Sequence, residues 1–464
     1  MDIAIFATEE TLIQDGVRLS HAAQHVRAST NEGLVALDAA GQVVPAIAER
    51  WIVTDDGLSY IFRLRSSNWP DGEEITAAEV RRLLREAIRK LDGTSLGLDL
   101  AKVTEVRAMT GRVVELRLSG PMPEFLRLLA QPELGLVNRG SGAGPMVLSR
   151  DDETQIIRLS ALPPQERGLP AKEDWEEVSR GLSVRALAGQ AAVDAFTGGD
   201  VDLLMGGTLA TFPLAKLGPL SRGTVQVDPA LGLFGFIIRS DAGVLSDPAR
   251  REALSMAIDR SVLMQPFGLG GWQPATWIVP QAMFAPTQYP LNRWDGLEID
   301  ERRQIARARI AQWEAGSGEQ AVLRLGLPEG PGSDLLYEQI AGAWQSIGVT
   351  LVRVGIGEGA ELELSDRMAR YSSPRWYLNQ FNCALDLGLC SPGADTLVRD
   401  SLSVRDPEEK QALLAEAHAE IIAAEVFIPL GVPVRWSLVR GAVSGYQANQ
   451  WGIHPLFPLS QPTN

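Results

Sequence analysis

The sequence is short of cysteine, of histidine and of long apolar runs, and each shortage excludes a class of protein. Only two cysteines and four histidines occur in 464 residues, which excludes a zinc site built mainly from cysteine. No apolar run reaches the roughly 18 residues that a membrane-spanning helix needs. Cations are also in deficit, with 43 Lys and Arg against 58 Asp and Glu and a net charge of −15. This balance argues against a nucleic-acid partner, because phosphate contacts need clustered cations.

What is present is the composition of a globular protein. Hydrophobic residues make up 45% and charged residues 22%, close to the averages for folded domains. The length predicts two to four domains. Strand-like and helix-like runs alternate, with 45 Gly and 28 Pro between them, which indicates a loop-rich α/β protein. The chain begins in a strand-like run at residues 2–7, so either the protein is cytosolic or a leader has been removed.

Local patterns predict several elements. Residues 51–54 and 60–65 are β-prone and flank an Asp-Asp-Gly turn, which predicts a hairpin. Thr76 and Glu79 form a capping box at the start of an amphipathic helix, whose arginines are expected on a solvated face. Residues 140–145 are the most glycine-rich stretch but lack phosphate-binding motifs, so we interpret them as a turn between domains.

The second half of the chain is richer in helical patterns. Asp247, followed by a proline, predicts a helix that extends to about Met264. Residues 336–347 carry an apolar stripe at helical spacing. A last long helix is predicted from Asp406 to about Ala424.

The histidines give no convincing catalytic or metal motif. His21 and His25 are four residues apart and so share one helical face, but no glutamate follows His21 and no third ligand is evident. We expect a structural or exposed pair there, a solvated His418 and a packed His454. No Gly-x-Ser-x-Gly elbow occurs. We therefore expect no catalysis, no metal and no cofactor.

Cys383 and Cys390 lie seven residues apart in a glycine-containing loop. They either close a small disulfide in an oxidising compartment or are two small apolar core residues. The spacing leaves both alternatives open.

A long stretch between residues 33 and 80 has the features of a known family. It contains Gly-Leu-Val-Ala-Leu-Asp, then Val-Pro-Ala-Ile-Ala-Glu-Arg-Trp, then Trp-Pro-Asp-Gly. Matching segments follow in the same order at 142–146, 195–202, 245–260 and 428–430. Together they resemble the family 5 extracellular solute-binding proteins, the peptide/nickel-type receptors of ABC importers.

The resemblance implies an α/β fold, the bilobal periplasmic binding protein type II fold (cluster C-like), with an extra subdomain in the first lobe. The chain then divides into a discontinuous first lobe at 1–32, 141–236 and 427–464, the extra subdomain at 33–140, and a second lobe at 237–426. Two crossings, near Leu231–Ile238 and Val426–Pro433, are expected to be the hinge strands.

The resemblance also implies a function. The protein is expected to capture a peptide-like or related small solute in a cleft between the lobes and to deliver it to an ABC permease in the inner membrane. We expect a monomer that is periplasmic or lipid-anchored at the cell envelope, with no nucleic-acid partner. Ligand contacts are expected beyond the first strand and in the second lobe, at Thr8, Glu9, Trp272, Trp376, Asn379, Gln380, Asn382 and Asp386.

One position departs from the family pattern. Peptide-binding relatives carry an aspartate that pairs with the ligand's amino group, and their usual Asp-Tyr-x-x-Pro is absent. Asn379 stands near the expected position, and an amide cannot neutralise an ammonium. Unless Asp386 supplies the charge, the ligand is expected to be neutral, a modified peptide or sugar-like. Trp272, Trp277 and Trp376 each either line the cleft or anchor the core.

Alternative functions stay open at this point. One is a solute sensor or chaperone-like binding module that takes no part in transport. Another is a nickel, opine or oligosaccharide receptor of the same fold. A hydrolase is a third class, without a supporting motif.

Overall fold

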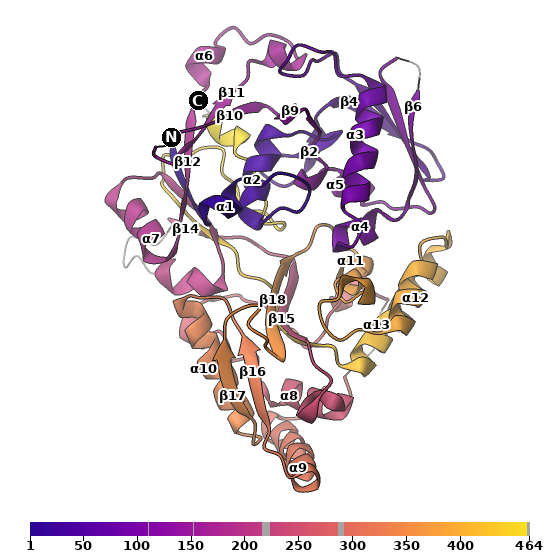
Figure 1. Ribbon diagram of the computed structural model, residues 1–464, viewed down its shortest axis with the longest axis vertical. Coiled ribbons are helices and arrows are strands. Elements are labelled where there is room, and N and C mark those ends of the chain that lie inside the picture. The colour runs from indigo at the N-terminus through magenta and orange to yellow at the C-terminus, as the bar shows by residue number, and fades with distance from the viewer. Residues whose placement is uncertain (110, 152, 216–222, 286–291, 462–464) are drawn as a thin grey trace. The chain divides into compact units, whose positions relative to one another are not determined.

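The computed structural model describes residues 1–109, 111–151, 153–215, 223–285 and 292–461, which fall into two compact units (Figure 1). Unit 1 comprises Met1–Thr208, Leu214–Ala230 and Val434–Asn464, and unit 2 comprises Leu209–Pro213 and Leu231–Pro433. The long passage of the chain through unit 2 therefore begins after Ala230 and ends at Pro433.

The main sheet of unit 1 has the strand order β10-β11-β12-β1-β13-β20-β14. Its strands are β1 (Asp2–Phe6), β10 (Met146–Arg150), β11 (Ile157–Ala161), β12 (Leu182–Leu187), β13 (Leu203–Gly207), β14 (Val225–Val227) and β20 (Trp436–Val439). β1 runs parallel to both β12 and β13, and the other pairs are antiparallel. Ile3, Ala4 and Ile5 of β1 are fully buried, as expected for a central strand with parallel neighbours.

Short helices cover this sheet and complete its core. They are α1 (Glu9–Leu12), α2 (His21–Thr30), α6 (Trp175–Val178) and α7 (Gly189–Gly198). α7 packs on β1 and β13, and α2 packs on β10. Leu12 and Val26 join Ile5, Val184 and Met205 in one apolar cluster, so the sheet is held by burial of a continuous apolar face.

A second, antiparallel sheet in unit 1 has the order β4-β5-β7-β6. Its strands are β4 (Ala48–Val53), β5 (Ser59–Leu64), β6 (Val103–Met109) and β7 (Val113–Leu118). The predicted hairpin is confirmed as β4–β5, and Gly57 takes a positive φ of 66° in its turn. Two small hairpins lie nearby, β2 (Val35–Leu37) with β3 (Val43–Pro45) and β8 (Val137–Asn138) with β9 (Ser141–Gly142).

Helix α3 (Ala77–Lys90) packs on β6 and β7, while α4 (Ser95–Leu100) and α5 (Phe125–Leu129) are shorter. The predicted capping box is confirmed: the Glu79 amide donates to Thr76 Oγ1, and the Thr76 amide donates to Glu79 Oε2, each at 3.3 Å. The helix buries its apolar face and exposes all four of its arginines. These arginines form a solvated surface, as predicted.

The sheet of unit 2 has the order β17-β16-β18-β15-β19. Its strands are β15 (Gly232–Ile238), β16 (Val322–Gly326), β17 (Thr350–Val354), β18 (Leu362–Met368) and β19 (Phe427–Gly431). β16 is parallel to both of its neighbours, and β15 is antiparallel to β18 and β19. β15 and β19, which are far apart in sequence, therefore lie side by side at one edge of the sheet.

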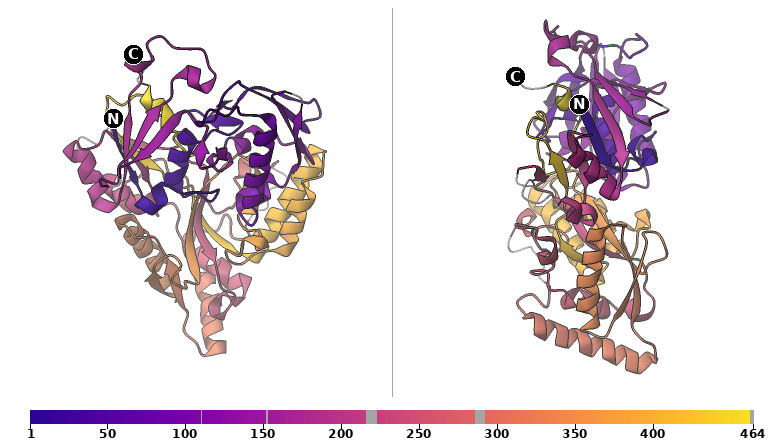
Figure 2. Two further views of the ribbon diagram at one scale, coloured as in Figure 1. Left: turned by 45° about the horizontal axis from the view of Figure 1, so that its top comes forward. Right: turned by 90° about the vertical axis from the view of Figure 1, so that its left-hand side faces the viewer.

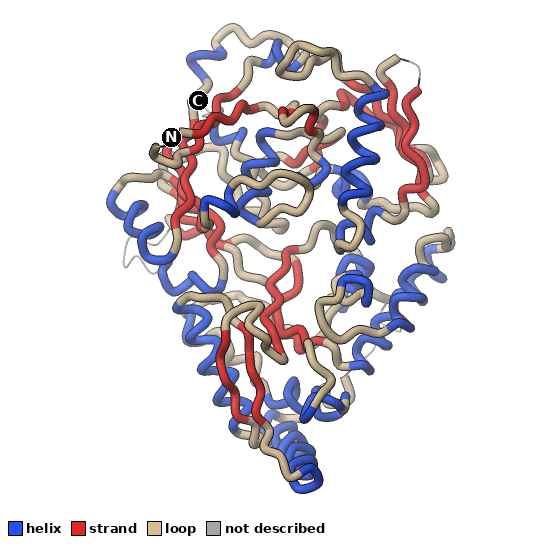
Figure 3. The backbone as a smooth tube through the Cα atoms, viewed as in Figure 1, coloured by secondary structure: helices blue, strands red, loops and turns tan. Residues whose placement is uncertain are grey.

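Helix α10 packs on β17 and α8 packs on β19, while α12 and α13 pack on each other and on α11 (Figure 1 gives the labels, and Figure 3 shows the same view by secondary structure). They are α8 (Pro248–Ala257), α9 (Ile299–Ser317), α10 (Pro331–Gln345), α11 (Pro374–Asn379), α12 (Pro392–Asp400) and α13 (Pro407–Ala424). α9 packs on α8 and lies at one end of unit 2 in every view (Figure 2). Across the described ranges, no helix has both the length and the apolar character to cross a membrane.

Helix α8 ends seven residues before the predicted Met264. Arg260, which is buried, explains the stop. Its guanidinium donates to the carbonyls of Ser255 and Ile258 at the helix end and to the Pro429 carbonyl in β19. These bonds satisfy helix-end carbonyls that would otherwise lack partners, so a tertiary contact sets the boundary.

The division into two units differs in detail from the predicted lobes. Residues 209–213 of the predicted first lobe belong to unit 2, and so do residues 231–236 and 427–433. The reason is that β15 and β19 pair with each other in the unit 2 sheet. The predicted subdomain at 33–140 contains the β4-β5-β7-β6 sheet and belongs to unit 1; its status as a separate subdomain remains a prediction.

Candidate functional site

Five of the predicted ligand residues lie in one segment of unit 2, between β18 and α12. Pro374 begins α11, where its fixed φ suits the first helical position. Every side chain of this six-residue helix is buried. Trp376 exposes 2% of its surface, and its ring meets Tyr377 edge to face at 4.8 Å. Trp376 therefore packs in a dense environment, and its role in binding stays a prediction.

The two polar residues that end this helical segment are also buried. Asn379 is 2% exposed and Gln380 is 3% exposed. The Gln380 Nε2 donates to the Trp376 carbonyl at 2.9 Å, and its Oε1 accepts from Arg367 Nη1 at 3.0 Å. The amide of Gln380 is thus fixed in orientation, with its oxygen directed at a guanidinium.

Asn382 and Asp386 belong to the turn that follows. Asn382 Oδ1 accepts from the Ala384 amide at 3.0 Å and so caps a 3-10 turn. Asp386 is exposed and has a positive φ of 50°. Cys383 and Cys390 are joined in a disulfide, which decides between the two alternatives for these cysteines and closes the loop that contains Asp386.

The other three candidates lie elsewhere in the chain. The Trp272 indole donates to the Val432 carbonyl at 2.8 Å and packs across Gly431, at the end of β19. In unit 1, Thr8 is the N-cap of α1, and exposed Glu9 lies 3.5 Å from Arg150. All three remain predicted contacts.

The sequence analysis did not identify three arginines that lie in or near the segment of predicted ligand residues in unit 2. Arg367 lies in β18, Arg370 follows that strand, and Arg375 lies in α11. Burial lowers the pKa of Arg367, and the like charge of Arg370 lowers it further. The sequence carried a signal for Arg370, because residues 370–374 read Arg-Tyr-Ser-Ser-Pro. This segment resembles the Asp-Tyr-x-x-Pro pattern expected of peptide-binding relatives, with Arg370 where the pattern has aspartate.

The histidines of unit 1 form a buried cluster. His25 is fully buried, with its ring 4.8 Å from His21 and stacked on His454 at 5.6 Å. His454 Nε2 lies 3.0 Å from Asp228 Oδ2, and the His454 amide donates to His25 Nδ1 at 3.0 Å. Burial first, and then its neighbours His21 and His454, lower the pKa of His25 well below the usual value. A neutral His25 that accepts a hydrogen bond from a backbone amide is a structural residue, which agrees with the prediction of a structural pair.

No group of three or more His, Cys, Asp or Glu with metal-binding geometry occurs within the described residues. The cluster around His25 instead joins α2 to the C-terminal tail through the His454 amide. The contacts of these rings are thus with other parts of unit 1.

His418 contradicts the prediction of a solvated side chain. It is 0% exposed, its ring stacks on Phe284 at 5.6 Å, and its Nε2 accepts from the Val279 amide at 3.4 Å. α13 buries a wider face than the predicted stripe, because segment 279–284 covers a second side of the helix. Burial lowers the pKa of His418 to about 4.

This burial predicts a loss of stability in acid. The unfolded chain binds a proton at His418 near pH 6.5, whereas the folded chain does so only near pH 4. Stability from this residue is therefore complete above pH 6.5 and is lost as the pH falls toward 4, by about 3 kcal/mol in all. Urea unfolding at pH 7 and pH 4 should show a smaller acid loss in His418→Gln than in the wild type. Equal losses in the two proteins would contradict the prediction.

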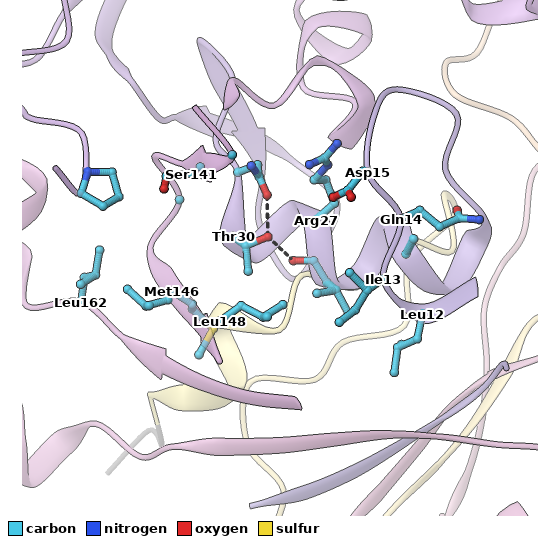
Figure 4. Close-up of a pocket in the computed structure, with 18 residues that line it drawn as sticks. Leu12, Ile13, Gln14, Asp15, Arg27, Thr30, Ser141, Met146, Leu148 and Leu162 are labelled. Carbon is cyan, nitrogen blue, oxygen red and sulfur yellow. Dashed lines mark hydrogen bonds between the residues drawn. The ribbon is translucent and has the colours of Figure 1, made fainter. Parts of the chain in front are cut away.

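Unit 1 contains a cavity of about 290 Å³ beside α2 (Figure 4). Arg27 and Asp15 lie on one side of it, and Met146, Leu148 and Leu162 lie on the other. The Arg27 guanidinium donates to the Gly16 carbonyl, and burial lowers its pKa against the opposing effect of Asp15. The Arg27 side chain, which lies on α2, thus holds the loop before this helix against it.

The glycine-rich stretch forms one wall of this cavity. The Gly144 amide donates to the Thr30 carbonyl at 3.0 Å. A Cβ on Gly144 would lie 2.2 Å from the Thr30 carbonyl carbon, and a Cβ on Gly142 would lie 2.2 Å from Asn31 Nδ2. The glycines allow two backbones to touch within unit 1. The prediction of a turn between domains is therefore wrong at the level of the two units, because the chain on both sides of this stretch belongs to unit 1.

Gly144→Ala is therefore expected to destabilise the protein by about 2–3 kcal/mol, since backbone atoms of Thr30 cannot move aside easily. Gly198→Ala is the matched control, because Gly198 ends a helix and its nearest contact would be 3.8 Å away. Chemical denaturation of both variants tests the difference. An equal stability of the two variants would show that the close approach does not matter.

The comparison with family models decides to which protein family the chain belongs. Residues 42–382 match the model of the bacterial extracellular solute-binding proteins, family 5 Middle. The chain belongs to the family 5 extracellular solute-binding proteins. The predicted fold class and the predicted solute-binding role are confirmed.

Relatives of this family 5 protein are similar to it in sequence over most of its length. It is 25% identical over 90% of its chain to a probable di/tripeptide-binding protein 5 of Pseudomonas aeruginosa, of which 87% is covered. It is 24% identical over 93% of its chain to the glutathione-binding protein GsiB of Salmonella paratyphi A, again with 87% covered. The crystal structure of Haemophilus influenzae OppA with the peptide RPPGFSPFR has the same fold, with a TM-score of 0.84, 18% identity and coverage of 100% of this chain and 99% of that one.

Proposed function

We propose that this family 5 protein captures a peptide or a related small solute and delivers it, chemically unchanged, to the permease of an ABC importer. The family match over residues 42–382 carries the proposal. The di/tripeptide-binding and glutathione-binding relatives support the substrate class. The protein would act as a monomer in the periplasm or anchored at the cell envelope, and the Cys383–Cys390 disulfide fits an oxidising compartment of this kind.

Binding would need no catalytic group, metal or cofactor. In this proposal the solute is enclosed between two lobes, where exclusion of water strengthens a few polar contacts. Trp376, Asn379 and Gln380 would act as one block, since they lie in consecutive turns and Gln380 is bonded to the Trp376 carbonyl. Trp272, Asn382 and Asp386 of unit 2, and Thr8 and Glu9 of unit 1, would complete the contacts.

Calorimetric titration with di- and tripeptides tests the proposal. We expect one-to-one binding, and stabilisation by about 2.7 kcal/mol when a peptide is present at 100 times its dissociation constant. Trp376→Leu should weaken binding at least tenfold. Trp313→Leu is the control, because Trp313 lies on α9, away from the predicted contacts in sequence. Absence of binding to every di- and tripeptide would refute the peptide class.

A further inference from the structure

The cavity beside α2 has two chemically different sides. Its volume is about 290 Å³, and the residues that line it all belong to unit 1. Met146, Leu148 and Leu162 form an apolar side, while Arg27 and Asp15 lie together on the opposite side (Figure 4). None of the predicted peptide contacts is among the described residues that line it, so the cavity is a site apart from those contacts.

The Arg27 guanidinium is held in place but only partly bonded. Its Nη2 donates to the Gly16 carbonyl, and its Nε is buried without a hydrogen-bond partner. Within the described ranges, Nη1 has no acceptor in the protein, and no carboxylate lies within ion-pair distance of the guanidinium. A cation with unused donors and no compensating anion therefore lines the cavity.

Asp15 supplies the opposite charge but is not paired with Arg27. Its side chain is exposed, it lines the same side of the cavity, and it makes no ion pair among the residues that the structure describes. Two opposite charges that line one cavity without neutralising each other can each bind the opposite charge on a single ligand.

A cavity between α8 and α9 in unit 2 lacks this property. It is larger, at about 500 Å³, and is also lined by arginines. Arg250 lies 3.3 Å from the Asp247 carboxylate, and Arg309 lies 2.7 Å from the Glu252 carboxylate. Because carboxylates of the protein already neutralise these cations, charge alone does not favour a ligand there.

The volume and the lining of the cavity beside α2 together define a ligand. A cavity of about 150 Å³ holds benzene, so one of about 290 Å³ admits a moderately larger molecule. That molecule needs an anionic group for Arg27, a cationic group for Asp15 and an apolar part for the methionine and leucine side chains. A free α-amino acid with an aliphatic side chain has all three.

We propose that this cavity is a second binding site and that it takes a free amino acid with an aliphatic side chain. The carboxylate binds Arg27 Nη1, the ammonium group binds Asp15, and the side chain packs against Met146 and Leu148. The inference goes beyond the proposed function and does not depend on it.

Binding at this site is expected to be weak. Asp15 and Ser141 line the cavity and are exposed, so the cavity stays open to water. The amino acid is therefore lost during purification, and the titration with peptides remains one to one.

Three compounds of similar shape provide the test: L-leucine, isocaproate, which lacks the ammonium group, and isoamylamine, which lacks the carboxylate. Binding is followed by NMR of the full chain with ¹³C-labelled methionine methyl groups, and Met146→Leu assigns the Met146 signal. Leucine should shift this signal saturably, whereas Met264, buried in unit 2, should not respond. Each analogue should bind at least tenfold more weakly than leucine, because it leaves one charge of the protein unpaired.

Charge-removing variants assign the two ends of the ligand. Asp15→Asn should abolish the preference for leucine over isocaproate, and Arg27→Gln should abolish the preference over isoamylamine. Because Arg27 also supports a loop, Asp15→Asn, at an exposed position, keeps the test decisive if Arg27→Gln does not fold. Arg158→Gln is the control, since Arg158 lies in β11 on the surface, 4.0 Å from Asp151, and it should bind leucine as the wild type does.

The possible results separate this inference from peptide capture. It would be overturned by an unchanged Met146 signal at every leucine concentration, by an analogue that binds as tightly as leucine, or by preferences that survive both substitutions. Competitive displacement of leucine by a dipeptide would also overturn it, because the cavity would then belong to the peptide site. None of these results contradicts peptide capture, which the titration with di- and tripeptides tests separately.

Discussion

Glu32→Ala is expected to lower the free energy of unfolding by about 3–5 kcal/mol, because it leaves two buried guanidinium groups without their shared carboxylate. Glu32 Oε2 lies 2.7 Å from Arg65 Nη2, and its Oε1 lies 2.9 Å from Arg167 Nη2. The side chains of Glu32 and Arg65 are 6% and 5% exposed, so water cannot replace the lost contacts. The ion pairs also join the segment after α2, the end of β5 and the turn at 164–167 of unit 1.

Glu49→Ala is the matched control. Glu49 also pairs with an arginine, Arg63, at 2.8 Å, but both side chains are more than 40% exposed. An exposed pair of this kind contributes less than about 1 kcal/mol. Urea denaturation of the two variants compares them directly, and a loss from Glu32→Ala as small as that from Glu49→Ala would show that the buried triad is not needed.

Trp344→Ala is expected to cost about 3–5 kcal/mol through the loss of a fully buried aromatic side chain. Trp344 is 0% exposed in α10, and its indole donates to the Leu254 carbonyl of α8 at 3.0 Å. Its ring meets Phe236 of β15 edge to face at 6.0 Å. One side chain thus connects two helices to the unit 2 sheet.

The control for Trp344→Ala is Trp313→Ala on α9, where the side chain is only half-buried and lies near Arg250. We expect this change to cost about 1 kcal/mol or less. Denaturation monitored by circular dichroism avoids reliance on tryptophan fluorescence. If the two variants were equally stable, Trp344 would not be the anchor that the contacts indicate.

Elements whose signals are local could be predicted from the sequence. The hairpin β4–β5 and helix α3 carry their turn and capping residues within a few positions, and both are found where predicted. The apolar stripe of α10, which includes Trp344, was recognised in the same way. Helical spacing and capping are properties of the chain itself, so these predictions need no tertiary information.

Features that depend on distant residues could not be predicted. The end of α8 is set by Arg260 and its bond to Pro429 in β19. His418 looked solvated among alanine and glutamate, but a segment more than 130 residues earlier covers it. The assignment of β15 and β19 to unit 2 follows from their mutual pairing, which no local pattern reveals.

In the candidate site, too, contacts between residues from different elements could not be predicted from the sequence. Sequence reasoning found the segment that contains Trp376 and Gln380, and the structure places them in one buried block. It did not find Arg367, because only the folding of β18 beside α11 brings its guanidinium to Gln380. A charged residue in a strand gives no sign of its partner until the register of the sheet is known.

Native mass spectrometry on the purified full chain is the most direct test of the central claim, that this protein holds one small solute reversibly and does not alter it. The account predicts a complex with one bound solute. That solute should be released on denaturation with an unchanged mass and should bind again, one to one, to the refolded protein. A solute whose mass changes during incubation, or a protein that takes up nothing from its extracted ligand or from peptides, would contradict the account.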